Sequence, residues 1–326
     1  MEKVIVIIPQ FNNIELLKNC ISSLENQNDK SFDILVVDNN STDGTRDYLS
    51  KKDNIIKILL DDNIGFAAGV NKGFDYAIKN DYKYAILLNN DTEVDKNFVS
   101  SLKSAIEKDS KIFSVSSFMI SLKNKNLIDD TGDSYCILGW GFQNCTGQKV
   151  NDYIKRKNIF SACGGASIYN LSILNKIGFL DEAHFAYLED IDLGYRAKIF
   201  GYKNIFDENA ICYHVGSATS GSKYNSFKVR LSSRNNAYLI YKNMPLVQFL
   251  INLPFLLLGT LIKQLFFIKK GFGTDFFFGI IDGIKDFRKL KKVQFKFSNL
   301  LNYVKIEVEL FVNTCFYVLD FIKRHV

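Results

Sequence analysis

Three groups of polar residues follow apolar runs in the first third of the chain. They occupy positions 38–40, 61–63 and 89–91, and the last group ends the stretch YAILLNND, residues 84–91. A strand that only had to turn would more typically end on Gly, Pro or a single Asn. Amide and carboxylate groups at the ends of several strands can hold a polar ligand, so we expect them to form one binding site.

A bound diphosphate would need a cation at this site. The segment IIPQFNN, at the end of the first apolar run, contains neither GxGxxG nor GxxxxGK[ST], which counts against an NAD enzyme or a P-loop ATPase. Without such a loop, a divalent cation must neutralise the phosphates, and Mg²⁺ prefers one or two carboxylates with phosphate oxygens. Asp91 is well placed to be such a carboxylate. His214, at the end of the last expected strand, could add an imidazole, which suits Mn²⁺ better.

Alternating strands and helices must position these groups. We expect strands at 4–8, 32–38, 55–60, 84–88 and 112–120, and helices at 12–27, 41–49, 67–80 and 96–109. This alternation predicts an α/β fold with a mostly parallel central sheet flanked by helices. In such sheets ligands bind outside the carboxyl ends of the strands, where the three polar groups lie.

The middle of the chain is less regular. Residues 120–158 are polar and weakly periodic, and we expect them to form an excursion that carries the substrate-side wall. Order returns at 159–178, followed by a helix over 185–201 that Gly201 closes and a last strand and loop over 204–219. Trp140 in the excursion could stack on a sugar or fill the core, and both interpretations stay open.

Several stretches together carry a family resemblance. They are IVIIPQFNN, ILVVDNNSTDGT, DNIGFAAGVNKGF, ILLNNDTEVD, GGASIYNLSILNKIGFLDEAHFAYLEDIDLGYRAKIFGYK and YHVGSAT, and they span roughly residues 1–220. In this order they resemble a family 2 glycosyltransferase of the GT-A fold, close to the bacterial rhamnosyltransferase-like branch. The stretch RNNAYLIYKNMP resembles the segment that follows the catalytic domain in that branch.

The resemblance implies a role for individual residues on the donor side. Pro9 and Asp38 would border the nucleoside pocket, with Asp38 accepting a hydrogen bond from the base. The full set of donor-binding residues that it implies is Pro9, Asp38, Asn40, Asn63, Gly65, Asn71 and Asn90. The adjacent glycines 164 and 165 would form the acceptor-side turn, where the backbone must approach the sugar closely.

The resemblance also implies a metal site and a base. NND matches the family's metal motif, usually DxD; since its first position is Asn89, Asp91 would carry the metal contact almost alone, with His214 as the second ligand. Asp190 in LEDIDLG matches the catalytic base, with Glu189 beside it. Each residue has a simpler alternative, because strand-end acids often cap turns and acids at a helix start complement its dipole.

The implied activity is transfer of a sugar with inversion. The donor would be a nucleoside-diphosphate sugar, of the dTDP-rhamnose or UDP-hexose type, and the acceptor a glycan or lipid-linked saccharide of a bacterial surface polysaccharide. A divalent cation, Mg²⁺ or Mn²⁺, would be the cofactor. A non-catalytic sugar-nucleotide or glycan-binding pseudoenzyme is the alternative. A nucleotidyltransferase is disfavoured because IIPQFNN is not a Gly-rich, basic loop.

Composition bounds the location. The chain has 326 residues, 47% hydrophobic and 23% charged, with a net charge of +6, which is typical of a folded protein. Its six cysteines form no CxxC pair, which suits a reducing cytosol. The apolar run near the N-terminus is too short for a signal peptide, so we expect the catalytic part in the cytoplasm.

The last hundred residues differ in composition from the rest. We expect a catalytic domain over 1–225 and a helical region over 226–326. Residues 249–262 are uncharged and mostly apolar, and residues 284–297 interleave Lys and Arg with Phe, Leu and Val. This pattern favours attachment to the cytoplasmic face of the inner membrane, with packing as a helical cap or true spanning as alternatives. Arg230 and Arg234 could contact a diphosphate, membrane phosphates or neither. We expect no nucleic-acid partner, and homo-oligomerisation stays open.

Overall fold

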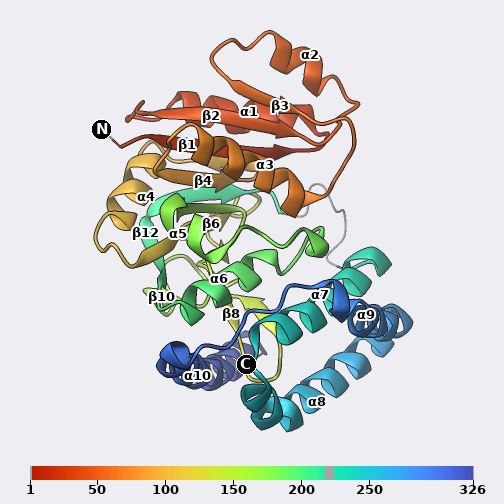
Figure 1. The fold of residues 1–326 in the computed structure, drawn as a ribbon. Helices are drawn as coiled ribbons and strands as arrows, with labels where there is room; N and C mark the ends of the chain where they lie inside the picture. The colour runs from red at the N-terminus through yellow and green to blue at the C-terminus, as the bar shows by residue number, and fades with distance from the viewer. Residues whose placement is uncertain (1, 217–223, 326) are drawn as a thin grey trace.

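The fold of this computed structural model is built on one mixed sheet with helices on both faces (Figure 1). The structure describes residues 2–216 and 224–325. The strand order in the ten-stranded sheet is β10-β12-β6-β11-β4-β1-β2-β3, with β5 on β12 and β7 on β6. The end of the YHVGSAT stretch, residues 217–219, lies outside the described residues.

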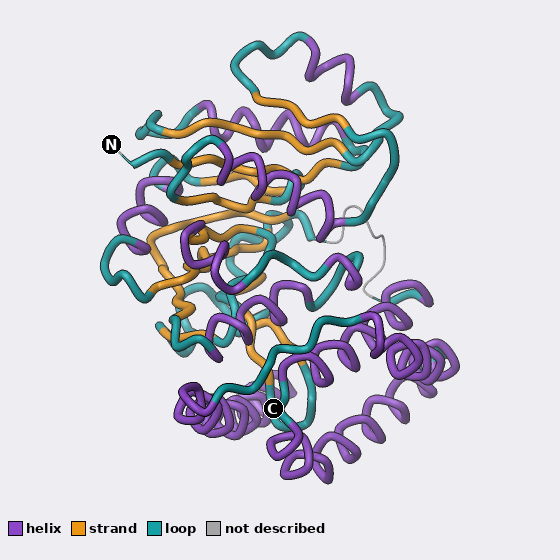
Figure 2. Tube along the Cα trace, in the orientation of Figure 1, coloured by secondary structure: helices purple, strands orange, loops and turns teal. Residues whose placement is uncertain are grey.

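Strands and helices largely alternate from β1 to α4, the segment from β6 to β11 contains strands without a helix, and the described chain after residue 225 is mostly helical (Figure 2). The strands are β1 (Val4–Gln10), β2 (Phe32–Asp38), β3 (Ile56–Leu59), β4 (Tyr84–Leu88), β5 (Thr92–Val94), β6 (Ile112–Ser121), β7 (Ile128–Asp130), β8 (Asp133–Tyr135), β9 (Gly141–Gln143), β10 (Asn158–Ile159), β11 (Ala166–Asn170) and β12 (Lys203–His214). The helices are α1 (Ile14–Glu25), α2 (Thr45–Ser50), α3 (Phe66–Lys79), α4 (Phe98–Ile106), α5 (Leu171–Ile177), η1 (Glu182–His184), α6 (Glu189–Ile199), α7 (Ser226–Asn243), α8 (Leu246–Lys269), α9 (Gly273–Asp286), η2 (Phe287–Lys289), η3 (Phe297–Asn299) and α10 (Leu300–His325).

The apolar run of β1 is explained by cover on both faces of the sheet. Successive side chains of a strand point to opposite faces. Val4, Val6 and Ile8 accordingly join one core cluster, with residues of α1 and α4. Ile5 and Ile7 join the other, with residues of α3, α5 and α6.

The direction of β11 places a turn beside the end of β4. β1, β2, β3 and β4 are parallel to one another in their pairs, and so are β6 and β12, as the sequence predicts for a mostly parallel sheet. β11 is antiparallel to β4, with Ala166 opposite Leu88. The turn at residues 163–165 therefore lies where β4 runs into Asn89 and Asp91.

The pairing of β12 brings its last residue to the same edge. β12 is parallel to β6 and antiparallel to β5, with His214 opposite Thr92. The backbone N–H of Val215 donates to the carbonyl of Asp91 at 3.0 Å. Residues more than a hundred positions apart are thus fixed side by side by strand pairing alone.

The C-terminal helices share a core with the excursion at 120–158 and with α6. One buried cluster contains Tyr135 of β8 and Tyr195 of α6 together with Leu256 of α8 and Leu310 of α10. Figure 1 shows α7–α10 gathered at the end of the molecule opposite α2 and β3. The predicted regions 1–225 and 226–326 are therefore joined by buried apolar contacts.

Trp140 fills part of this junction. Its indole N–H donates to the carbonyl of Gly259 in α8 at 3.1 Å, and its ring packs edge-on against Tyr317 of α10. The side chain is buried. Of the two interpretations left open by the sequence, core packing is the one that the structure shows.

Helix α8 buries polar side chains and exposes apolar ones. Gln248 and Asn252 are buried, and both amides donate to Glu307 of α10, at 2.8 and 2.9 Å. The exposed large apolar residues of α8 are Leu246, Val247, Leu250, Ile251, Phe255, Leu257, Leu258, Leu261, Ile262, Leu265, Phe266 and Ile268. By length and composition alone, this helix is the one in the described chain that could cross a membrane.

Candidate active site

The predicted metal ligands lie in contact. His214 Nε2 is 3.2 Å from Asp91 Oδ1, and on its other side His214 Nδ1 is 2.7 Å from Asp129 Oδ2. Asp129 comes from β7, which pairs with β6 next to β12. Two strands, β7 and β12, and the turn between β4 and β5 therefore supply this row of carboxylate, imidazole and carboxylate.

The two carboxylates stabilise the protonated form of the imidazole that lies between them. Burial alone would lower the pKa of His214, but hydrogen bonds to Asp129 and Asp91 outweigh it and raise the pKa to about 10. A carboxylate oxygen and an imidazole nitrogen are ligands that Mn²⁺ and Mg²⁺ accept. The second carboxylate on the other ring nitrogen is the usual way to fix the orientation of a metal-ligating histidine. The residues present thus fit a divalent cation.

A short turn connects this row to the predicted base. The N–H of Asn89 donates to the carbonyl of Gly165 at 2.8 Å, and the N–H of Gly164 donates to Asp190 Oδ2 at 3.1 Å. A side chain at residue 165 would lie 3.3 Å from the amide of Asn89, so the backbone packs tightly there. The segment that carries Asp91, through Asn89, and the carboxylate of Asp190 are therefore bonded to the same three-residue turn.

Asp190 lies in the first turn of α6. Its carboxylate accepts from the N–H of Ile191 at 2.8 Å as well as from Gly164. Burial raises the pKa of Asp190, and the hydrogen bonds from Gly164 and Ile191 offset part of that rise. Next to it, burial and the charge of Asp190 raise the pKa of Glu189 to about 8, and Glu189 Oε2 is a buried atom without a hydrogen-bond partner among the described residues.

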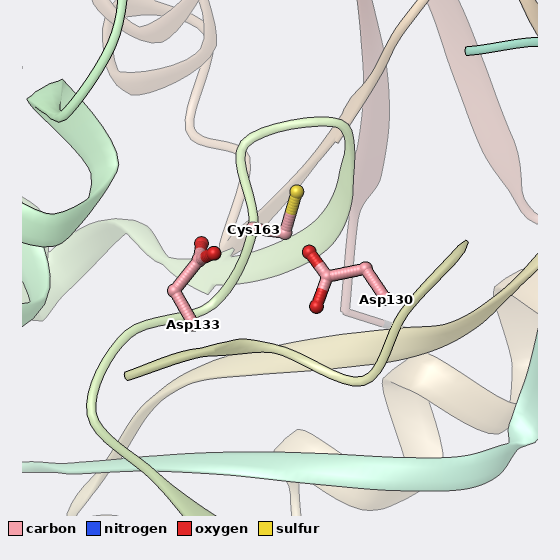
Figure 3. A group of neighbouring side chains, drawn as sticks. All are labelled: Asp130, Asp133 and Cys163. Atoms are coloured by element: carbon pink, nitrogen blue, oxygen red, sulfur yellow. The ribbon is translucent and has the colours of Figure 1, made fainter. Parts of the chain in front are cut away.

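Two further acids lie beside the turn and were not predicted. Ligand atoms of Asp130, Asp133 and Cys163 are all within 4.8 Å of one another, and Figure 3 shows these three side chains beside one another. These acids and Asp129 belong to the excursion at residues 120–158, and the weak periodicity of that segment did not point to them. The available signal was the stretch DDTGD, residues 129–133, where acids flank a glycine turn.

The donor-side residues lie in or just after the last residues of β1, β2 and β4. Asp38 is fully buried and accepts from the N–H of Ser41 and from Arg46 Nε at 2.8 Å. Pro9 lies in β1 opposite Val37, and Asn40 has a left-handed backbone with φ 64°. The amide of Asn90 donates to Gln10 Oε1 at 2.6 Å. These residues lie at one edge of the sheet, and their role in donor binding stays a prediction.

The remaining predicted donor residues shape the loop that precedes α6. Asn63 Oδ1 accepts from the N–H of Gly65, whose φ is +89°. A Cβ at Gly65 would lie 2.5 Å from the ring of Phe185, so only glycine fits there. The amide of Asn71 donates to the Leu180 carbonyl and to Glu182, and its oxygen accepts from the Leu180 N–H. Asn71 therefore holds the loop in place.

The loop itself is strained and is held by α7. Phe185, Tyr187 and Leu188 all have positive φ, between 62° and 72°. Non-glycine residues in this region cost free energy and persist only when neighbours fix them. The buried amide of Asn235 donates to the carbonyls of residues 184, 186 and 187, and Arg234 donates to those of 183 and 184. Helix α7 thus fixes the segment that leads to Asp190.

Arg230 and Arg234, whose roles the sequence left open, both have partners within the protein. Arg230 forms an ion pair of 2.8 Å with Asp282 of α9. Arg234 lies over the ring of Tyr238 in addition to its bonds to the loop. Both arginines therefore connect elements of the fold.

The family model described as glycosyl transferase family 2 matches residues 5–178, which is more than half of the chain. The chain belongs to glycosyl transferase family 2. Its α/β architecture is that of the GT-A glycosyltransferases. Asp190 and His214 lie beyond the matched residues, so this match does not cover the two residues that the resemblance suggests as base and second metal ligand.

Two curated relatives and one solved structure illustrate the similarity. GalNAc(5)-diNAcBac-PP-undecaprenol beta-1,3-glucosyltransferase of Campylobacter jejuni is 36% identical over 107 residues, which cover 31% of this chain and 34% of that protein. Low-salt glycan biosynthesis hexosyltransferase Agl10 of Haloferax volcanii is 24% identical over 86% of this chain and 91% of its own. The structure of GalNAc-T7 with UDP, GalNAc and Mn²⁺ aligns over 74% of this chain and 48% of that one, with a TM-score of 0.59 and 13% identity.

The coverage differs among these matches. The chain spans only about a third of the Campylobacter protein, and 19% of each of two Rickettsia glycosyltransferases at 35–36% identity. The similarity to GalNAc-T7, at 13% identity, concerns the fold.

Proposed function

We propose that this chain transfers a sugar from a nucleoside-diphosphate donor to a hydroxyl group of a glycan or lipid-linked acceptor, with inversion at the anomeric carbon. The turn at residues 163–165 is the observation that carries this proposal. It is bonded on one side to the segment of Asp91 and on the other to Asp190. A leaving-group site and a base on opposite sides of one turn suit a direct displacement.

Asp190 acts as the general base in this reaction. An acceptor hydroxyl is a weak nucleophile at neutral pH, so its proton passes to the Asp190 carboxylate as its oxygen bonds to the anomeric carbon. The bond from that carbon to the diphosphate oxygen breaks at the same time, and the nucleoside diphosphate leaves with the electron pair. Attack from the face opposite the leaving group inverts the configuration.

Asp91 and His214 would hold a divalent cation, Mg²⁺ or Mn²⁺. When bound, the cation neutralises the charge that develops on the departing diphosphate. Asp129 orients His214 through the 2.7 Å hydrogen bond to its other nitrogen. The GalNAc-T7 structure holds Mn²⁺ together with UDP, which supports this choice.

The donor and acceptor classes follow from the resemblance and from the relatives' names. A dTDP-rhamnose donor is expected from the rhamnosyltransferase-like motifs, and the names of the glucosyl- and hexosyltransferase relatives support a hexose donor, for which a UDP-hexose is the alternative. The Campylobacter relative is named for a substrate on undecaprenyl diphosphate, which supports a lipid-linked saccharide acceptor in bacterial glycan synthesis.

Attachment to the cytoplasmic face of the membrane completes the proposal. α8 carries its amides inward and its Leu and Ile side chains outward, which is the distribution of a helix in contact with lipid. The basic side chains of residues 285–296 are exposed and would attract anionic lipids. A lipid-linked acceptor would then lie in the surface to which the enzyme is attached.

The test of the proposed function begins with a panel of UDP- and dTDP-sugars. Binding is followed by thermal stabilisation, and turnover by release of nucleoside diphosphate with and without a lipid-linked acceptor. Once a donor is found, Asp190→Asn should lower the turnover about a hundredfold or more and leave donor binding nearly intact.

A matched control is Asp109→Asn. Asp109 is an exposed acid paired with Lys203 just before the start of β6, at the edge of the sheet away from the site. This variant should keep both binding and turnover. Full turnover in Asp190→Asn would rule out Asp190 as the base, and donor binding by the wild type without any turnover would favour the pseudoenzyme.

A further inference from the structure

Two carboxyl groups and a thiol converge beside the turn that precedes β11. Asp130 and Asp133 come from the excursion, and Cys163 is the first residue of the turn. Ligand atoms of these side chains all lie within 4.8 Å of one another. Figure 3 shows the carboxyl groups of Asp130 and Asp133 facing each other, with the sulfur of Cys163 beside the space between them. The cluster shares no residue with the row of groups around His214.

The backbone brings these side chains together. Asp133 forms reciprocal backbone hydrogen bonds with Ser161, at 2.8 and 3.1 Å, and Ser161 lies two residues before Cys163. Between the two acids, Gly132 turns the chain with a φ of +98°, and a Cβ there would lie 2.5 Å from the side chain of Ile159. The arrangement of the cluster is therefore set by the fold around it.

Asp130 has the surroundings of a metal-ligating carboxylate. The N–H of Gly132 donates to Asp130 Oδ1 at 2.6 Å, and Gln143 Nε2 donates to Asp130 Oδ2 at 3.2 Å. Carboxylates that bind metals are themselves hydrogen-bonded by groups outside the ligand set. An ionised carboxylate offers about four lone-pair sites on its two oxygens, so these two bonds leave sites free for an ion.

Asp133 provides the observation that points to a ligand. The residue is 5% exposed, and its Oδ2 is buried without a hydrogen-bond partner among the described residues. Figure 3 shows that the carboxyl group holding this oxygen points toward Asp130 and Cys163. Because a buried charge is normally paired or bound to a metal, this orientation suits a cation within the cluster.

The charges of the cluster agree with a cation. Burial raises the pKa of Asp130 to about 7. Burial, together with the charges of Asp130 and Asp133, raises the pKa of Cys163 well above its ordinary value. A divalent ion reverses this balance, because a thiol that coordinates a metal gives up its proton to the solvent.

We propose that Asp130, Asp133 and Cys163 bind a zinc ion, which ties the excursion to the turn at residues 163–165. A thiolate ligand favours zinc over Mg²⁺ or Mn²⁺, and zinc also accepts carboxylate oxygens. Three protein ligands leave a fourth position for water. Cys163 is only half-buried, which gives the ion a path into the site.

The spacing of the ligand atoms fits zinc after small side-chain rotations. Zn–O and Zn–S bonds of about 2.1 and 2.3 Å place the ligands of a tetrahedral ion about 3.6 Å apart. The limit of 4.8 Å, within which all the ligand atoms lie, exceeds this spacing by only about 1 Å. Rotations of the side chains close such a difference while the backbone stays in place.

A zinc ion at this position would also support the predicted base. Cys163 directly precedes Gly164, whose N–H donates to Asp190 Oδ2 at 3.1 Å. The ion would hold the turn to which this carboxylate is bonded and would touch neither donor nor acceptor. Its binding can therefore be measured without knowing the substrate.

The first test adds Co²⁺, a coloured substitute for zinc, to the full chain after treatment with a chelator. Cobalt bound to a thiolate absorbs in the near ultraviolet, whereas cobalt bound only by carboxylate and imidazole groups lacks this band. The band therefore reads this site and not the predicted one at Asp91 and His214. About one equivalent of cobalt should give the band, and Zn²⁺ should remove it. A wild-type protein without the band would overturn the proposal.

Variants assign the band to individual ligands. Cys163→Ser should abolish it, and Asp133→Asn should weaken zinc binding by more than the 10- to 100-fold that is typical of outer groups, about the range expected for Gln143→Ala. Cys315→Ser is the control, because Cys315 is an exposed cysteine of α10. A band that persists in Cys163→Ser, or zinc affinity unchanged in Asp133→Asn, would overturn the proposal.

A measurement on the wild type covers the case in which the variants do not fold. Cys163 is half-buried and Cys315 exposed, while the other four cysteines are buried. Alkylation of each cysteine is followed by mass spectrometry of its peptide. Zinc should slow the labelling of Cys163 by about 10-fold or more and leave that of Cys315 unchanged. Equal labelling of Cys163 with and without zinc would overturn the proposal.

The outcomes separate this inference from the proposed function. If Asp190→Asn keeps its turnover, the proposed base is wrong and the zinc measurements are unaffected. If zinc binds nowhere in the cluster but Asp190→Asn is inactive, the zinc site fails and the proposed function stands.

Discussion

At the scale of residues, the site is built from neighbouring titratable groups. His214 lies between Asp91 and Asp129. Asp129 would set the orientation of the imidazole that touches the metal. Single-residue motifs point to the first member of such a pair and say little about the second.

Asp129 provides a test of the metal side. Because an outer carboxylate fixes the metal-ligating face of a histidine, Asp129→Asn should weaken metal affinity by about 10- to 100-fold. The measurement is the Mn²⁺ concentration that gives half-maximal stabilisation by a nucleoside diphosphate. Asp152→Asn, an exposed acid of the same excursion, should leave this concentration unchanged. Equal values for both variants would show that Asp129 does not orient a ligand.

Glu189 gives a prediction about stability and pH. Its pKa is raised from 4.5 to about 8, so between these values the native protein keeps a proton that the unfolded chain has released. Raising the pH therefore favours unfolding, by about 1.4 kcal/mol per pH unit while one proton differs. Glu189→Gln should be more stable than the wild type at about pH 8, with the difference vanishing toward pH 4.5. Urea unfolding across this range checks it, and parallel curves for the two proteins would contradict it.

At the scale of elements, strand direction explains why the sequence motifs meet. β11 runs antiparallel to β4, so its first residue lies beside the last residue of β4. β12 pairs with β5, so His214 lies beside the segment of Asp91. Helix α6 begins directly after the loop whose residues 185, 187 and 188 have positive φ, and its Asp190 is bonded to the turn that precedes β11.

Asn235 tests the role of α7 in holding that loop. Asn235→Ala removes three hydrogen bonds to strained backbone, so it should lower the free energy of unfolding by about 1 to 3 kcal/mol and lower turnover more than donor binding. The neighbouring variant Asn236→Ala loses one hydrogen bond, with Tyr135, on the side away from the loop. Denaturant unfolding and turnover are measured for both. A stable Asn235→Ala with normal turnover would show that the loop holds its shape unaided.

Much of the element order was predictable, and the exceptions have physical causes. The buried parallel strands were recognisable because covering helices on both faces require unbroken apolar runs such as residues 4–8. The direction of β11 and the contacts of Asp129 and Asp133 were not predictable, because they depend on tertiary pairing within and around an irregular segment. The roles of Asp91, Asp190 and His214 came from the motifs that carry the family resemblance and stay predictions, while no motif indicated Asp129 beside His214.

At the scale of the whole molecule, the C-terminal helices both complete the core and offer an apolar surface. Deleting them would uncover buried residues such as Tyr195, because α8 and α10 pack on α6 and β8. The sequence predicted a boundary near residue 226 from composition, yet composition does not show that the two regions share one buried cluster. Membrane attachment must therefore be tested by surface substitutions.

We expect the double variant Leu257→Glu and Leu261→Glu to lose binding to vesicles. Both side chains are more than half exposed, and charges there would have to leave the lipid interface. Leu59→Glu on β3, at the opposite end of the molecule, serves as the control. Co-sedimentation with vesicles of neutral and of anionic lipids is measured, and the wild type should bind the anionic vesicles more tightly. Unchanged sedimentation of the double variant would show that α8 does not contact the membrane.

The burial of Trp140 between α8 and α10 has a practical consequence. It is the only tryptophan in the chain, so the intrinsic tryptophan fluorescence of the protein comes from one known position. Any shift of α8 when the protein meets a bilayer would change the environment of that indole. The emission maximum is thus a built-in optical reporter of how the helical end responds to lipid, with no label to attach.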